Sequence, residues 1–129
     1  IGVDLVKPTA VLEPAYDDPL GVTAAFNRNM LLHLNRLAGT VFDIADSRHV
    51  AFFNSIDSRI EMHLEALRAA TVRWHGGERS FVAGERMHTE NSYKWQVDDF
   101  AALLQQAGFS RLRHWTDESG WFAVFLGFA

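Results

Sequence analysis

The chain has 129 residues, 48% of them hydrophobic and 22% charged, which suits one folded domain and argues against disorder. The net charge is −4 without a basic block, and no apolar run is long enough to span a membrane, so we expect neither nucleic acid nor a membrane as a partner. Cysteine is absent, which excludes disulfides and thiolate metal sites and favours a cytoplasmic location.

The chain opens on "IGVDLVKP", whose apolar residues from Ile1 to Val6 indicate a strand already in progress, and no initiating Met precedes them. We therefore expect the chain to be part of a longer protein. Pro8 and Pro14 bracket the next segment, which is too short and too interrupted for a long helix.

The stretch "YDDPLGVTAAFNRNMLLHLNRLAG" predicts a helix. Asp17 or Asp18 can accept the free N–H groups of the first turn, and Pro19 fits the first helical position. Gly39 supplies the stop. Five apolar residues recur at helical spacing and are expected to face the core: Val22, Phe26, Met30, Leu34 and Leu37.

The middle of the chain has the period of strands. Residues 59–65 alternate strictly between polar and apolar side chains, which predicts a strand with one dry face and one wet face. Gly76 and Gly77 indicate a turn between two further strands. We expect an antiparallel meander from about His49 to Tyr93.

The last third predicts a helix over 97–107 that ends at Gly108, followed by a hairpin with its turn at 117–120. A helix followed by such a hairpin is typical of the end of nucleotide-type α/β sheets, in which the last strand is inserted antiparallel. We expect this unit to share its core with the meander. The fold class is therefore α/β, or α+β when this chain is taken alone.

Six histidines raise the question of a metal site. His63 lies two residues before Glu65, and His88 two residues before Glu90, so alternation places each pair on one strand face. Two ligands do not fix a zinc ion, and no HExxH spacing occurs. We expect scattered surface histidines and no metal. The glycines form no nucleotide-binding loop, which argues against a self-contained nucleotide-binding enzyme.

The segment "AGERMHTENSYKW" has the spacing of a strand but carries a carboxylate and a hydroxyl, Glu90 and Ser92, on one face. A carboxylate that faces an apolar interior is costly unless a partner donates to it. One interpretation is a charged residue at the rim of a sheet. The other is an acceptor pair for a ligand with N–H groups, such as an imidazole, an indole or an ammonium.

Five motifs in order resemble the histidine-specific N-alpha-methyltransferases of ergothioneine biosynthesis: "IGVDLVKP", "YDDPLGVTAAFNRNMLLHLNR", "RIEMHL", "AGERMHTENSYKW" and "AGF…WTDESGWFAVFL". The resemblance covers essentially this whole chain, but only the C-terminal part of that family. It implies a Rossmann-like domain that binds S-adenosylmethionine and an inserted domain that binds the amino acid. Residues 1–8 would end a cofactor-domain strand, 9–92 would form the substrate-binding domain, and 93–129 would close the cofactor domain with a helix and a β-hairpin.

The resemblance also implies a site for L-histidine in a methyltransferase that acts on the alpha-amino group. Tyr16 matches a tyrosine that helps to hold the amino-acid head. Phe26 and Met62 match residues of the pocket wall, although the pattern alone predicts both as core. Glu90 and Ser92 match the pair that hydrogen-bonds the imidazole, so Glu90 is expected to set specificity and not to act as a general base.

The family's glycine-rich cofactor loop and its other substrate contacts lie before Ile1. We therefore expect no S-adenosylmethionine-binding residue here, and no methyl transfer by this chain alone. Two alternatives stay open: the same fold acting on another amino acid, and a non-catalytic binding module derived from the substrate domain. Uncovered apolar surface and an unpaired strand edge predict self-association.

Overall fold

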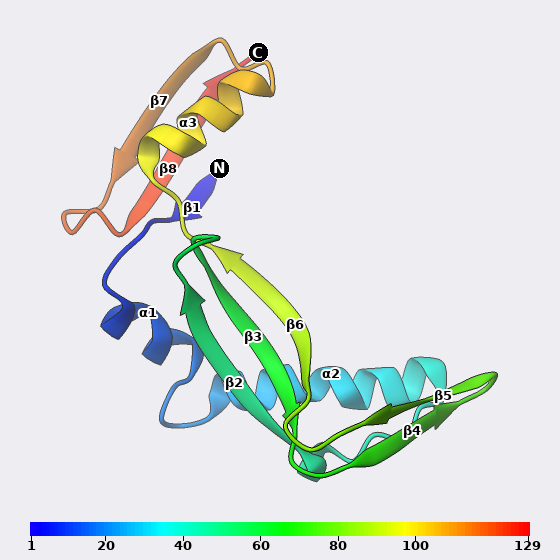
Figure 1. Cartoon of the computed structure of the whole chain (residues 1–129). Coiled ribbons are helices and arrows are strands. Elements are labelled where there is room, and N and C mark those ends of the chain that lie inside the picture. The colour runs from blue at the N-terminus through cyan, green and yellow to red at the C-terminus, as the bar shows by residue number, and fades with distance from the viewer.

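The computed structural model describes all of residues 1–129, and the chain forms two units joined at one end (Figure 1). The first unit is a sheet with one helix: β1 (Gly2–Asp4), α3 (Val97–Gln106), β7 (Arg111–Thr116) and β8 (Phe122–Phe128). The second contains two helices, a sheet, a hairpin and a 3-10 helix: α1 (Thr9–Tyr16), α2 (Val22–Ala38), η1 (Ile44–Asp46), β2 (Ser47–Asn54), β3 (Arg59–Ala66), β4 (Ala70–Trp74), β5 (Gly77–Phe81) and β6 (Arg86–Tyr93). This mixture confirms the α+β fold class. None of the helices is long and apolar enough to cross a membrane.

The last strand is inserted antiparallel, as predicted. Strand β8 lies between β1 and β7 and runs antiparallel to both. Its buried residues, Ala123 and Phe125, face α3, where Phe100 and Leu104 complete one apolar cluster. The predicted turn is also confirmed, because the Asp117 carboxylate accepts hydrogen bonds from backbone N–H groups on the far side of the turn.

The two units do not share a core, so that expectation was wrong. The buried residues of the first unit cluster around α3 and β8, and those of the second are Leu12, Ile60 and Met62. The chain passes between the units twice, and the two passages meet at a single parallel bridge between Leu5 and Trp95. Asp4 forms ion pairs with Lys7 and Lys94 at this junction.

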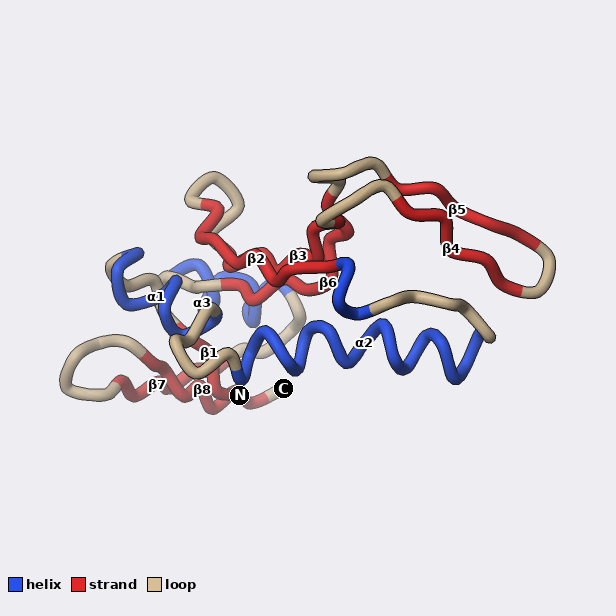
Figure 2. The backbone as a smooth tube through the Cα atoms, turned by 90° about the horizontal axis from the view of Figure 1, so that it is seen from below, coloured by secondary structure: helices blue, strands red, loops and turns tan.

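The predicted continuous meander was also wrong. Strand β6 pairs with β3, giving the order β2–β3–β6, while β4 and β5 form a separate hairpin that projects from the sheet (Figures 1 and 2). The hairpin turn itself is confirmed, with Gly76 at a φ of 97°. Two backbone hydrogen bonds close the base of this insertion, from Gly84 to Ala66 and from Ala66 to Glu85. The alternation of polar and apolar residues identifies each strand but does not show which other strand it pairs with.

Helix α2 begins at Val22, later than predicted. The Asp18 carboxylate accepts hydrogen bonds from the N–H groups of Val22 and Thr23 at 3.0 and 2.8 Å, which confirms it as the acceptor of the first turn. Pro19 lies in the turn before the helix and not at the first helical position. Gly39, in the left-handed conformation, ends the helix as predicted.

The buried face of α2 differs from the predicted one. Its buried residues are Asn27 and Leu31, whereas three of the predicted core residues are largely exposed: Val22, Phe26 and Leu37. The reason is a buried amide. Asn27 Nδ2 donates to the backbone oxygen of His63 and to Nδ1 of His49, so a polar contact fixes how the helix is rotated against the sheet.

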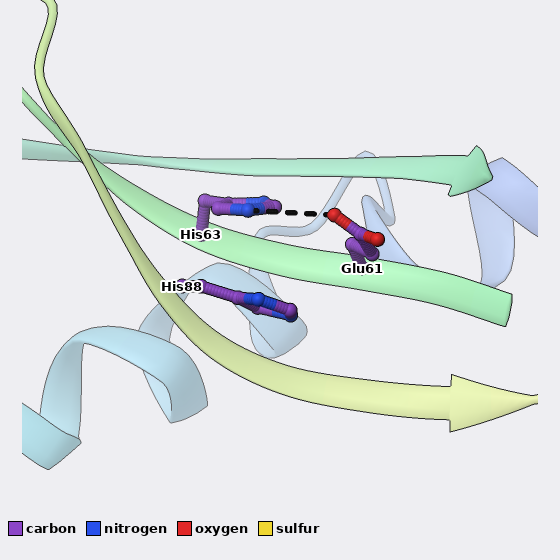
Figure 3. Close-up of side chains that lie close together, drawn as sticks. All are labelled: Glu61, His63 and His88. Atoms are coloured by element: carbon purple, nitrogen blue, oxygen red, sulfur yellow. Dashed lines mark ion pairs between the residues drawn. The ribbon is translucent and has the colours of Figure 1, made fainter. Parts of the chain in front are cut away.

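The polar face of β3 is buried, although the alternation predicted a wet face. Glu61, His63 and Glu65 are each 8% exposed. Arginine side chains cover the carboxylates, and the rings of Phe52 and His88 stack on His63 at 5.4 and 4.6 Å between centroids. Figure 3 shows Glu61 and His63 side by side on β3, with His88 on the neighbouring strand. Long side chains and aromatic rings therefore shield this polar face from solvent.

Candidate functional site

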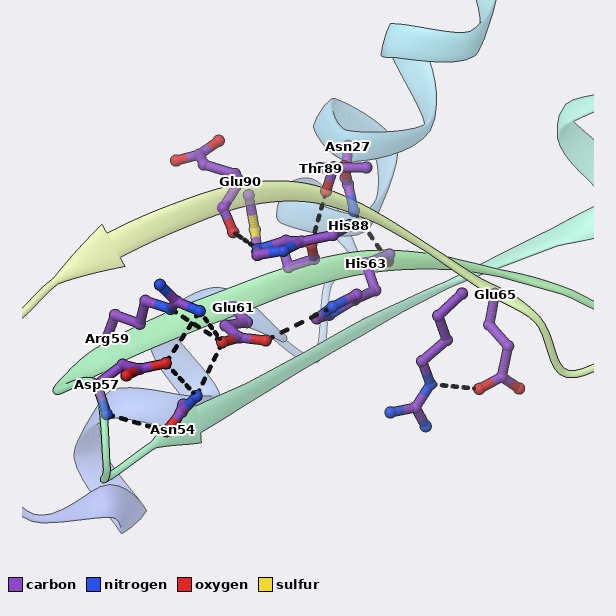
Figure 4. Close-up of polar contacts among 12 residues, drawn as sticks. Asn27, Asn54, Asp57, Arg59, Glu61, His63, Glu65, His88, Thr89 and Glu90 are labelled. Atoms are coloured by element: carbon purple, nitrogen blue, oxygen red, sulfur yellow. Dashed lines mark hydrogen bonds and ion pairs between the residues drawn. The ribbon is translucent and has the colours of Figure 1, made fainter.

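A β-bulge in β6 decides which side chains reach the helix-covered face of the sheet. Glu90 pairs with Met62 and His88 pairs with His63, so Thr89 is the extra residue. Its hydroxyl donates to the backbone oxygen of Met62 at 2.9 Å. The bulge places His88 and Glu90 on opposite faces, which overturns the expectation from simple alternation. Figure 4 shows the Glu90 carboxylate pointing away from the histidines.

Glu90 and Ser92 lie on one face, as predicted. Ser92 pairs with Ile60, and Glu90 with Met62, and both of these β3 residues belong to the apolar cluster beneath α1. The Ser92 hydroxyl is 2.7 Å from the hydroxyl of Tyr16, which α1 supplies from its last residue. Two residues that the sequence places 76 positions apart are therefore in direct contact.

A buried lysine fixes both hydroxyls. Lys94 Nζ donates to the Tyr16 hydroxyl at 2.7 Å and to Ser92 Oγ at 2.9 Å, and lies 4.6 Å from the centre of the Tyr16 ring. Its side chain is fully buried. Its counter-charge is Asp4, with Nζ to Oδ2 at 2.8 Å, and Lys7 binds the other oxygen of that carboxylate. The junction between the two units therefore also supports the site.

Asp4 stays ionised in this setting. Burial would by itself raise the pKa of the Asp4 carboxyl, but the hydrogen bonds and charges of Lys7 and Lys94 outweigh burial and leave that pKa below its usual value. The charge that balances Lys94 is therefore present throughout the neutral pH range.

Phe26 and Glu90 meet in a hollow of about 270 Å³ between α2 and β6. Its lining comes from one face of the helix and from the bulge: Phe26, Asn27, Asn29, Met30, His33, Thr89 and Glu90. Phe26 is 66% exposed, so it is a wall residue of this hollow and not a core residue. The Glu90 side chain is exposed and makes no hydrogen bond or ion pair within the chain, which leaves its carboxylate available to a ligand.

Met62 has a different place from the other four predicted residues. It is 3% exposed and packs with Leu12 and Ile60 beneath α1, without lining the hollow. The apolar pattern therefore located Met62 correctly as a core residue. The other four fall into two contacting pairs, with Tyr16 against Ser92 and Phe26 with Glu90 in the hollow. Neither Tyr16 nor Ser92 lines the hollow itself.

Sequence reasoning missed the polar residues that support this face. His49 Nε2 donates to the backbone oxygen of Tyr16 at 2.7 Å, because its Nδ1 already accepts from the Asn27 amide. Lys94 did carry a signal, since it continues the period-two series from Glu90 through Ser92. Asn27 and His49 carried no such signal. They are 22 residues apart, on a helix and a strand, and the hydrophobic pattern does not predict that these two elements are in contact.

The opposite face holds a second polar group that the sequence analysis treated as scattered histidines. Glu61, His63 and His88 each offer one ligand atom within 4.8 Å of the others. Burial lowers the pKa of His63, and the nearby His88 lowers it further, while Glu61 acts in the opposite direction. The scattered-surface interpretation was therefore wrong for His63, which is buried, whereas His88 is at the surface but stacks on the His63 ring.

Comparisons with known proteins agree on one family. A family model described as histidine-specific methyltransferase, SAM-dependent, matches residues 1–128. The chain is 47% identical over 128 residues to a histidine N-alpha-methyltransferase of Mycobacterium tuberculosis and 46% identical to one of Mycolicibacterium smegmatis, which covers 98% of this chain and 40% of each relative. It is 32% identical over 124 residues to the N-methyltransferase imqF of Aspergillus flavus, across 93% of this chain and 33% of that protein. The chain thus spans about 40% of the length of the mycobacterial relatives.

Proposed function

The chain belongs to the family of histidine-specific, S-adenosylmethionine-dependent methyltransferases, and on that premise we propose that it supplies the histidine-binding part of such an enzyme. The ligand is L-histidine, and the reaction of the complete protein is methylation of its alpha-amino group, within the ergothioneine biosynthesis that the resemblance implies. Residues 9–92 form the substrate-binding domain, flanked by 1–8 and 93–129 of the cofactor domain. The absence of cysteine agrees with a cytoplasmic location.

The observation that carries this proposal is the unpaired Glu90 carboxylate beside the anchored Ser92 hydroxyl. Residues two apart in a strand are separated by about 7 Å along the chain. An imidazole whose two nitrogens, about 2 Å apart, each make a hydrogen bond of about 2.8 Å spans a similar distance. The ring of histidine therefore matches the spacing of the two groups, with Glu90 as acceptor for a ring N–H.

The hydrogen-bond count around Ser92 leaves one hydrogen for the substrate. Lys94 is a donor only, so the oxygens of Tyr16 and Ser92 both accept from it. The contact between the two hydroxyls uses one of their two hydrogens. The other hydrogen has no acceptor among the hydrogen bonds of the chain and is available either to the second ring nitrogen or to the carboxylate of the amino-acid head near Tyr16.

We expect the residues that bind S-adenosylmethionine to lie outside this chain, and two observations support that expectation. No hollow is lined by β7 or β8. The glycines with positive φ all lie in turns or at helix ends: Gly21, Gly39, Gly76, Gly84, Gly108 and Gly120. We propose that the cofactor contacts belong to sequence that the longer relatives have in addition. This chain alone then transfers no methyl group, and product formation by it would contradict that part of the proposal.

The main rival is the same fold acting on another amino acid. An indole has one N–H, so it would leave either Glu90 or the hydroxyl pair without a partner, and a site built on hydrogen bonds rejects a ligand that leaves its groups unpaired. A non-catalytic histidine-binding module would use the same contacts. The proposed enzyme and this module differ in one respect: only the enzyme predicts that a longer protein containing this chain methylates histidine.

Calorimetric titration of the chain with L-histidine and with L-tryptophan tests the proposed ligand. We expect weak, saturable binding of L-histidine, no detectable binding of L-tryptophan, and loss of histidine binding in Glu90→Ala. Glu78→Ala, in the exposed β5 strand, is the matched control and should bind as the wild type does. Tryptophan binding equal to histidine binding would contradict the substrate while leaving the site in place. Equal histidine binding by Glu90→Ala would contradict the site.

A further inference from the structure

We propose that Glu61, His63 and His88 form a binding site for a divalent transition metal, with zinc as the expected ion. The three side chains lie on the face of the β2–β3–β6 sheet that no helix covers, opposite the proposed histidine site (Figures 2 and 3). One ligand atom from each lies within 4.8 Å of the others. The site goes beyond the proposed function and does not depend on it.

His63 is buried, as Glu61 is, and lacks the partners that a buried imidazole needs. The residue is 8% exposed, and its Nδ1 is buried without a hydrogen bond. Its Nε2 lies 3.6 Å from Glu61 Oε2, which is too long for a hydrogen bond. Buried polar atoms are nearly always satisfied in folded proteins, so an imidazole with neither nitrogen bonded indicates a missing partner. A metal ion between Nε2 and the carboxylate oxygen would give Nε2 a partner, with the ring hydrogen on Nδ1.

Glu61 is held so that one oxygen remains for a metal. Its Oε1 accepts from Arg59 Nε and Nη2 at 2.9 and 2.7 Å and from Asn54 Nδ2 at 2.9 Å. Its Oε2 makes no hydrogen bond and faces His63 (Figure 4). Arg59 also pairs with Asp57 at 3.1 Å, so the arginine charge is matched without Glu61. The Glu61 charge is therefore left to balance a cation, and its donors fix the carboxylate as outer partners of metal ligands do.

His88 completes the set from the neighbouring strand. Its Nε2 lies 3.2 Å from the backbone oxygen of Glu90, and donation to that oxygen leaves a lone pair on Nδ1. Metal-binding histidines commonly donate their other ring N–H to a backbone carbonyl in this way. His88 is exposed, so its ring can turn to shorten the ligand separations toward the about 3.3 Å that adjacent ligands of tetrahedral zinc require.

The donor set selects the class of metal. Two imidazole nitrogens and one carboxylate oxygen suit Zn²⁺, Co²⁺ or Cu²⁺, whereas Mg²⁺ and Ca²⁺ prefer oxygen ligands. Three protein ligands leave a fourth position for water on the exposed side. A bound metal would link His88 on β6 to Glu61 and His63 on β3. His88 is adjacent to the bulge at Thr89, and this bulge determines the face on which Glu90 lies.

Titration of the whole chain with Co²⁺, followed by the visible absorption of the bound ion, and with Zn²⁺ by calorimetry tests this site. We expect one equivalent to bind, and His88→Ala to weaken binding by about tenfold or more. His75→Ala, in the exposed β4–β5 turn, should bind as the wild type does. His88 is exposed, so its variant should remain folded, which circular dichroism checks. At equal zinc concentration, the melting temperature should rise by the same amount in the wild type and in His75→Ala, and by less in His88→Ala.

Two results would overturn the proposal. One is the absence of saturable Zn²⁺ and Co²⁺ binding by the folded wild type. The other is binding that His88→Ala and His75→Ala reduce equally, because it would assign the metal to histidines in general and not to this cluster.

Discussion

At the scale of single residues, buried polar side chains position the candidate site. Lys94 holds two hydroxyls of the proposed histidine site, and Asn27 and His49 link α2 and the end of α1 to the sheet. Each is satisfied by several partners, and removal of one partner leaves the others buried and unpaired. These residues therefore contribute to stability as well as to the geometry of the site.

Replacement of Lys94 by Met should destabilise the chain by about 3 kcal/mol, because it removes the buried charge that pairs with Asp4 and leaves two hydroxyls without their donor. Urea unfolding measures this loss. Lys7→Met is the matched control and should cost clearly less, since the only hydrogen bond of the Lys7 ammonium is to Asp4, whereas Lys94 also donates to two hydroxyls. A double-mutant cycle with Asp4→Asn should show strong coupling to Lys94, and additive effects would contradict the described network.

Asn27→Ala should cost about 2 kcal/mol, because the His63 carbonyl and His49 Nδ1 lose a buried donor. The measurement is again urea unfolding. Asn29→Ala, at an exposed position two residues on in the same helix, should change stability by less than about 0.5 kcal/mol. Equal effects of the two substitutions would mean that the amide does not anchor α2.

The polar partners also explain which residues could be predicted from the sequence. The strand period was enough to place Glu90 and Ser92 on one face, and the resemblance added Tyr16 and Phe26 to it. The period could not place His88, because a bulge at Thr89 reverses the side on which it lies. It could not find Asn27 either, because amphipathic patterns assign buried positions to apolar residues.

At the scale of elements, the first turn of α2 depends on Asp18. Hydrogen bonds from the backbone N–H groups of Thr23 and Val22 lower the pKa of the Asp18 carboxyl to about 2. The unfolded chain protonates this group at a higher pH than the folded chain does. Its contribution to stability is therefore complete above the unfolded pKa, near 4, and is lost as the pH falls toward 2.

Asp18→Ala should consequently lower the urea midpoint at pH 7, and the difference from the wild type should shrink as the pH falls from about 4 toward 2. Asp17→Ala is the control, because its side chain makes no contact with the first turn of α2. A difference between wild type and Asp18→Ala that stays constant over this pH range would contradict the role of the carboxylate.

Element types were easier to predict than their partners. The hydrophobic period predicted α2, α3, the four longer strands and both hairpin turns, because these depend on local spacing and on turn residues. The pairing of β6 with β3 was not predictable in this way, since β4 and β5 are inserted between them in the sequence. The burial of the polar face of β3 was missed because arginines and rings from neighbouring strands cover it.

At the scale of the whole molecule, the sheet of the first unit has one uncovered apolar face. Helix α3 covers Ala123 and Phe125, while the alternate residues of β8 and one residue of β7 are exposed on the other side: Trp115, Phe122, Val124, Leu126 and Phe128. A contiguous apolar surface of this kind favours association. We expect the chain to self-associate as its concentration rises.

Light scattering on a concentration series tests this expectation. Val124→Lys places a charge in the middle of the exposed face and should shift the chain to the monomer. Leu20→Lys changes an isolated apolar residue that is 90% exposed in the turn before α2, and should leave association unchanged. A wild-type chain that remains monomeric at high concentration would contradict the expectation.

The central claim is that Glu90 and Ser92 bind the imidazole of L-histidine on the helix-covered face of the β2–β3–β6 sheet. The most direct measurement is a titration of the ¹⁵N-labelled chain with L-histidine, followed by two-dimensional NMR. We predict saturable shifts concentrated at Tyr16, Phe26 and the 89–92 segment, and their loss in Glu90→Ala. The absence of saturable shifts there, or shifts of the same size in Glu90→Ala, would contradict the claim.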